Sequence, residues 1–110
     1  TYNGVGPRHL SSSFHNQKDV PQHILEQLDV THWPTWTTSD KPKWQVNNLV
    51  QDKVMPYSEL SYMIKGRLEI IDSMTKNVHI VEAGDFVTFP QNYCASWRVL
   101  EELTWYYYLY

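Results

Sequence analysis

The chain has 110 residues, of which 42% are hydrophobic and 15% aromatic, and a formal net charge of −3. This size and composition predict a single domain with a hydrophobic core, and the Lys and Arg residues are scattered singly, which argues against a nucleic-acid partner. A single cysteine, Cys94, excludes an internal disulfide and fits a reducing compartment. No apolar run approaches the ~18 residues that span a membrane, so we expect an intracellular protein that is soluble or peripheral.

Residues 1–18 have the composition of an extended polar arm. The segment starts at Thr1, contains no Asp or Glu and includes a Ser triplet. Ser-rich, acid-poor leaders are typical of organelle transit peptides, so the arm could follow such a cleavage site in a plastid; a trimmed start is the alternative. It has no hydrophobic period, and we expect it to be ordered only where something holds it. The remaining residues, 19–110, are predicted to form one domain.

A short helix is predicted at the start of that domain. Asp19 suits its N-cap, Pro21 suits its first turn, and an apolar stripe follows from Ile24 to Leu28. The next segment, residues 31–44, alternates Trp with Pro, Thr, Ser and charged residues. This pattern favours extended or turn structure over helix.

From residue 44 onward the sequence predicts only strands. Short runs rich in β-branched and aromatic residues alternate with turn residues. The runs are residues 44–51, 59–64, 67–72, 77–82, 85–90, 95–100 and 103–110. The expected turns are Lys65-Gly66, residues 72–77, Ala83-Gly84, Gln91-Asn92 and Glu101-Glu102. So many short strands at close spacing predict an all-β sandwich or barrel.

Two glycines are expected to take a positive φ. Gly66 and Gly84 lie between apolar runs, where a tight reversal of the chain often requires the left-handed region that glycine enters without a Cβ clash. Asp85 follows Gly84 directly, and its carboxylate is predicted to accept hydrogen bonds from backbone amides of the turn rather than to act as an acid catalyst.

Several motifs in these strands resemble those of cupins. Glu59 followed by Gly66 is similar to the second half of the first cupin motif, and AGDFVTFPQN at residues 83–92 is similar to the start of the second. The small single-barrel cupins share further features, which here are WPTW at 33–36, ELSYMIKGRLEI at 59–70, GDFVTFP at 84–90 and Trp97. The resemblance implies an RmlC-like jelly-roll β-barrel over residues 19–110, with a short N-terminal helix and an extended N-terminal arm.

The resemblance does not extend to the metal ligands of cupins. Metal-binding members share a His-x-His pair before the Glu and another His after the second motif. Here QDKVMPYS at residues 51–58 contains no His, and Ala95 occupies the position of the last His. The five histidines lie elsewhere, at His9, His15, His23, His32 and His79. Because stable transition-metal sites need three or four protein ligands, we expect no metal and no cofactor.

A small pocket is expected inside the barrel. The resemblance points Glu59 inward, and strand alternation puts Ser61 and Met63 on the same face. The same alternation directs Ala95 and Trp97 inward from a later strand. One carboxyl, a hydroxyl and apolar walls suit a small ligand, and a dry Glu59 would have a raised pKa and could act as a general acid or base. The alternative is that hydroxyls or water satisfy Glu59 and nothing binds.

The five Trp and eight Tyr residues exceed what a small core requires. In residues 105–110 consecutive rings fall on both faces of one strand, so both faces must be covered, by the same chain, a second subunit or a larger partner. The interface candidates are Trp33, Trp36, Trp105 and Tyr107. The alternative for the 33–36 segment is that it packs over the barrel within the chain.

Two functions follow from this reading. The first is a degenerate, metal-free cupin that acts without catalysis as an accessory or interaction subunit of a larger assembly, with a protein partner or as a homodimer. The second is a small-molecule-binding protein or a metal-independent enzyme that handles a polar metabolite or sugar in the pocket of Glu59. No catalytic residue is assigned unless the second holds, in which case Glu59 is the candidate.

Overall fold

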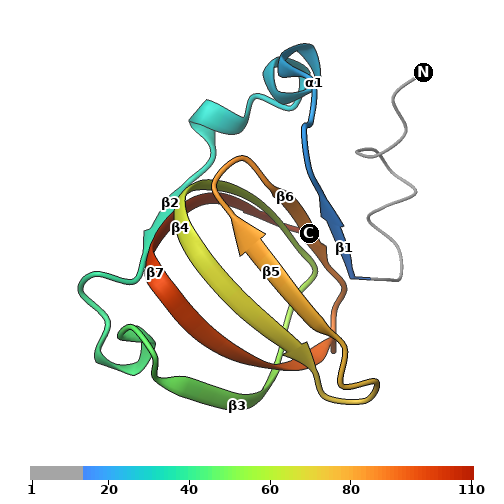
Figure 1. Cartoon of the computed structure of the whole chain (residues 1–110). Helices are drawn as coiled ribbons and strands as arrows, with labels where there is room; N and C mark the ends of the chain where they lie inside the picture. The colour runs from blue at the N-terminus through green and yellow to red at the C-terminus, as the bar shows by residue number, and fades with distance from the viewer. Residues whose placement is uncertain (1–13) are drawn as a thin grey trace.

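The structure is a computed structural model that describes residues 14–110. Seven antiparallel strands form one sheet that curls into a barrel, and a short helix lies at one end (Figure 1). The strands are β1 (His15–Gln17), β2 (Thr35–Thr37), β3 (Leu49–Val54), β4 (Glu59–Asp72), β5 (Val78–Glu82), β6 (Phe86–Phe89) and β7 (Cys94–Leu109). The helices are α1 (Gln22–Gln27) and two 3-10 turns, η2 (Val30–His32) and η3 (Pro42–Trp44). The predicted all-β class is confirmed.

Two long strands organise the barrel. β4 pairs with β7 along its whole length, from Glu59 opposite Leu109 to Asp72 opposite Ala95. The first half of β4 also pairs with β6, and its second half pairs with β5. In the same way β7 pairs with β3 near its start and with β2 near its end. Since both strands change partners halfway, the sheet bends there and closes around a core (Figure 1).

The predicted chain reversals at Gly66 and at Glu101-Glu102 are wrong. Both β4 and β7 continue without a turn through these positions, although the register between them shifts on either side of Lys65. Gly66 does have a positive φ of 100°. A Cβ on it would lie 2.3 Å from the backbone oxygen of Glu102, so glycine permits a close approach of two bent strands rather than a turn.

The turn at Gly84 is confirmed. Gly84 has a φ of 93°, and Asp85 Oδ2 accepts a hydrogen bond of 2.9 Å from the backbone N–H of Glu82. The same oxygen accepts hydrogen bonds from Asn16 Nδ2 at 3.3 Å and from Lys18 Nζ at 2.7 Å. Asp85 is therefore a buried acceptor that ties the turn to the N-terminal strand.

The N-terminal strand β1 extends the sheet beyond β6. His15, Asn16 and Gln17 pair with β6, and the ring of Phe14 stacks on Tyr93 with centroids 5.1 Å apart. The end of the predicted arm is thus held by the barrel, while its first thirteen residues lie outside the described part. The boundary between arm and domain stays a prediction.

The short helix forms as expected, but its predicted cap is wrong. α1 begins after Pro21, no side chain caps it, and Asp19 has a left-handed φ of 58°. Leu25 of α1 packs with Leu60 and Phe86 on the outside of the barrel. Within residues 14–110, no helix has the length and apolarity to cross a membrane.

The strand expected at 44–51 is shifted toward the C-terminus. Pro42 begins η3, which includes Trp44, and Asn47 has a positive φ of 69°. The strand then runs from Leu49 to Val54. Proline favours the first position of a helical turn because it lacks an N–H, and this brings Trp44 against the barrel opening.

Candidate ligand-binding site

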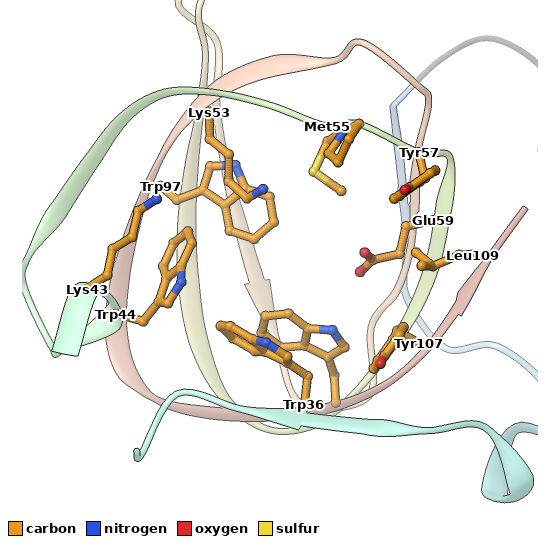
Figure 2. Close-up of a pocket in the computed structure, with 12 residues that line it drawn as sticks. Trp36, Lys43, Trp44, Lys53, Met55, Tyr57, Glu59, Trp97, Tyr107 and Leu109 are labelled. Atoms are coloured by element: carbon orange, nitrogen blue, oxygen red, sulfur yellow. The ribbon is translucent and has the colours of Figure 1, made fainter. Parts of the chain in front are cut away.

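A cavity of about 370 Å³ opens into the barrel beside Glu59 (Figure 2). Its walls come from β2, η3, β3, β4 and β7. Half of the lining residues are aromatic, and the charged groups are Glu59, Lys43 and Lys53. Below it, the barrel is filled by apolar side chains such as Leu68, Ile70 and Val99.

Four tryptophans form a continuous wall of this cavity. Trp36 of β2 lies on Trp105 of β7 with ring centroids 4.4 Å apart. Trp44 of η3 meets the edge of Trp36 at 5.8 Å and of Trp97 at 5.6 Å. Indole faces of this kind bind flat or apolar ligand groups as well as cations.

Glu59, the first residue of β4, points into the cavity from one side (Figure 2). Its Oε2 accepts a hydrogen bond of 2.5 Å from Ser61 Oγ. Burial raises the pKa of Glu59, and this effect exceeds the opposing influence of Ser61, of the Lys53 charge and of the Trp105 indole. The carboxyl group is thus only partly compensated while it faces an open cavity.

Two lysines lie across the cavity from Glu59 (Figure 2). Lys53 Nζ is 5.8 Å from the centroid of the Trp97 ring, and Lys43 Nζ is 5.7 Å from that of Trp44. Burial lowers the pKa of Lys53, and the charge of Lys43 lowers it further, whereas Glu59 raises it. Neither lysine was predicted from the sequence, because Lys53 follows an irregularity of β3 and Lys43 lies in a 3-10 turn, so strand alternation assigns neither of them to the cavity.

The predicted pocket residues lie at different depths. Glu59 and Trp97 line the cavity, and Ser61 is buried behind the Glu59 carboxylate. Met63 and Ala95 are inside the barrel with exposures of 1% and 0%. Neither Met63 nor Ala95 is among the residues that line the cavity.

The predicted interface residues also fall into two groups. Trp36, Trp105 and Tyr107 line the cavity, and Trp105 is only 5% exposed. Trp33 lies outside the barrel, where its Nε1 donates to the backbone oxygen of Leu28 at 3.0 Å. Within the described residues the 33–36 segment therefore packs over its own barrel, and an interface role for these rings stays a prediction.

The site does not fit a divalent metal ion. In the part of the chain that the structure describes, no three His, Cys, Asp or Glu side chains are grouped so that they could hold one. The cavity offers one carboxylate, Glu59, and places the Lys53 cation opposite it. A site with one anionic ligand and a neighbouring cation lacks the donors that a transition metal requires.

The curled antiparallel sheet and the cavity at its open end define a cupin. A family model described as the EutQ-like cupin domain matches residues 25–107. The chain belongs to this family, as the resemblance of its motifs implied. No curated protein matches the chain.

Solved structures of bacterial proteins share the fold. A DUF861 family protein from Thermotoga maritima has a TM-score of 0.73 and 26% sequence identity, covering 89% of this chain and 100% of that one. The Clostridium difficile EutQ protein has a TM-score of 0.52 and 17% identity, covering 88% of this chain and 94% of that one. A putative ethanolamine utilization protein EutQ from Salmonella typhimurium has a TM-score of 0.50 and 16% identity, covering 69% of this chain and 52% of that one.

Proposed function

We propose that this protein binds a small polar molecule in the tryptophan-lined cavity and that Glu59 contacts the ligand. The observation that carries the proposal is the position of the Glu59 carboxyl group, which is desolvated, held by Ser61 and open to the cavity. A partly compensated carboxylate destabilises a fold, and groups that do so are commonly retained at functional sites.

The cavity has the properties of a small-molecule site. Its volume of about 370 Å³ falls in the range of roughly 300–1,000 Å³ of ligand pockets. Its wall is mainly aromatic and apolar with a few charged groups, which is the pattern that gives both affinity and orientation. Because burial moves the pKa values of Glu59 and Lys53 toward each other, the two groups could also exchange protons with a bound molecule, as a metal-independent enzyme would require.

A compound screen on matched variants tests this proposal. A defined set of small metabolites, including sugars, amino acids and organic acids, is added to the protein, and the melting temperature is recorded. We expect at least one compound to raise it for the wild type and not for Glu59→Gln. Glu69→Gln is the control, because Glu69 lies on the outside of β4 near Arg98. If no compound acts, or if the hits act equally on Glu59→Gln, the proposal fails.

A second candidate function is that of an accessory subunit of a larger assembly. It is favoured by two large apolar side chains at the rim of the cavity, Tyr57 and Leu109, which are 58% and 44% exposed. Such exposure at a rim suits contact with a different protein of a larger assembly.

Native sizing of an extract from the source separates the two candidates. Elution with a large species supports the accessory function, and elution as a free monomer or dimer contradicts it. A variant without residues 1–13 then tests whether the arm is the anchor. The truncation stops there because Phe14 and β1 belong to the described fold, so removal of all eighteen residues is expected to lower the melting temperature.

A further inference from the structure

The two lysines of the cavity have no carboxylate partner. In the described part of the chain, Lys18, Lys41 and Lys65 each form an ion pair with a carboxylate. Lys43 and Lys53 form none within residues 14–110, although they come from different elements, η3 and β3, and reach the same side of the cavity (Figure 2). The cavity wall thus carries two ammonium groups that no carboxylate contacts directly, and the charge of Glu59 acts on Lys53 from across the cavity. Such a pair of cations suits a bound anion.

The surroundings of these lysines favour an anion as well. Lys53 is half-buried, and both its burial and the charge of Lys43 lower its pKa. A bound anion would relieve both effects. This side of the cavity therefore favours an acidic ligand group.

The opposite side of the cavity limits the ligand to one acidic group. Glu59 faces the cavity there (Figure 2), and a second acid placed against it would meet a like charge. The space between is bounded by the rings of Trp44, Trp97 and Trp36, which suit a flat or apolar body.

We propose that the ligand of this cavity is a small molecule with a flat apolar body and one acidic group, a carboxylate or a phosphate, which binds on the side of Lys43 and Lys53. Its body packs against the Trp44 and Trp97 rings, and its other end carries a neutral or basic polar group that hydrogen-bonds to Glu59. This inference rests on the proposed function, since it names the class of molecule that the same cavity takes.

Matched aromatic probes test the charge of the ligand. Benzoate, phenyl phosphate and their neutral analogue benzamide are titrated at low ionic strength, and binding is followed by calorimetry and tryptophan fluorescence. We expect at least one acid to bind about tenfold more tightly than benzamide, which corresponds to ~1.4 kcal/mol. The ratio of the dissociation constants of benzoate and phenyl phosphate distinguishes a carboxylate ligand from a phosphate ligand. Added salt should weaken the preference for the acids over benzamide.

Lysine variants locate the acid in the cavity. Lys53→Met and Lys43→Met should each reduce the preference for the acid over benzamide, measured as the ratio of the two dissociation constants. Lys76→Met is the control, because Lys76 is an exposed lysine in the turn between β4 and β5. Circular dichroism and melting curves confirm that each variant is folded.

Three results would overturn the inference. The first is equal binding of benzamide and both acids by the wild type. The second is an acid preference that persists in Lys53→Met and Lys43→Met. The third is no binding of either acid at millimolar concentration. If neutral compounds from the screen still bind in a Glu59-dependent way, the proposed function survives while the acidic ligand does not.

Discussion

At the scale of single residues, Glu59 has a pH dependence that differs from that of an ordinary paired carboxylate. Burial raises its pKa above the usual 4.5, so the folded protein binds this proton more tightly than the unfolded chain does. The contribution of Glu59 to stability is therefore favourable in acid and is lost as the pH rises from 4.5 through the raised pKa.

Glu59→Gln is expected to stabilise the protein near neutral pH. Glutamine keeps an oxygen that can accept the Ser61 hydrogen bond but carries no charge to desolvate. The free energy of unfolding should rise by about 0.5–2 kcal/mol. This gain should fade at pH values below the pKa of an ordinary glutamate. Urea unfolding at the two pH values measures it. A loss of stability at neutral pH would instead mean that the carboxylate is a structural ion-pair partner.

The two glycines with positive φ should respond differently to alanine. At Gly84 a Cβ meets nothing within 4 Å, so Gly84→Ala should cost only the strain of the left-handed backbone, about 1–2 kcal/mol. At Gly66 the Cβ would also clash with backbone atoms of Glu102 and Leu103, which cannot move away as a flexible side chain could. Thermal unfolding should therefore show a larger loss for Gly66→Ala than for Gly84→Ala, and equal losses would contradict the close approach of the strands.

At the scale of elements, the N-terminal strand depends on one carboxylate. Asp85 is 3% exposed. Its Oδ2 accepts hydrogen bonds from Glu82, Asn16 and Lys18. Hydrogen bonds to a charged group contribute more than neutral ones do. β1 is thereby attached to the turn between β5 and β6, although more than sixty residues separate the two in sequence.

Asp85→Asn should weaken this attachment. The uncharged amide cannot compensate Lys18, and we expect a loss of about 1.5–3 kcal/mol in unfolding free energy. Amide exchange of His15 to Gln17 should also become faster than in the wild type. Asp40→Asn is the control, because Asp40 pairs with Lys41 on the surface and should change neither quantity. Unchanged exchange in β1 would show that its backbone pairing with β6 suffices.

At the scale of the whole molecule, the long pairing of β4 with β7 should be the most stable unit. Leu68, Ile70 and Val99 of these strands are fully buried in the main core. Their amides should exchange only through global unfolding, whereas those of the short strands β1 and β2 should exchange through local opening. Native-state hydrogen exchange measures both classes, and protection of β2 equal to that of β4 would contradict this hierarchy.

Much of the architecture was readable from local patterns. The motif resemblance directs Glu59 inward, strand alternation puts Ser61 and Met63 on its face, and the structure places Ser61 and Met63 among the buried residues. Strand alternation also separated Trp105, Tyr107 and Leu109, which line the cavity, from Tyr106 and Tyr108. A period of two is a property of one strand, so it needs no knowledge of the partner strand.

The bend at Gly66 and the charges of the cavity depended on tertiary structure instead. A glycine followed by the alternating residues 67–72 is equally compatible with a turn and with a bent strand, and the approach of Glu102 to Gly66 distinguishes the two. Lys43 faces the cavity because η3 carries it there, sixteen residues before Glu59 and on no shared strand. Motifs and periodicity thus specify the fold and the inward carboxylate, whereas the composition of the cavity arises from contacts between distant segments, whose geometry no local pattern encodes.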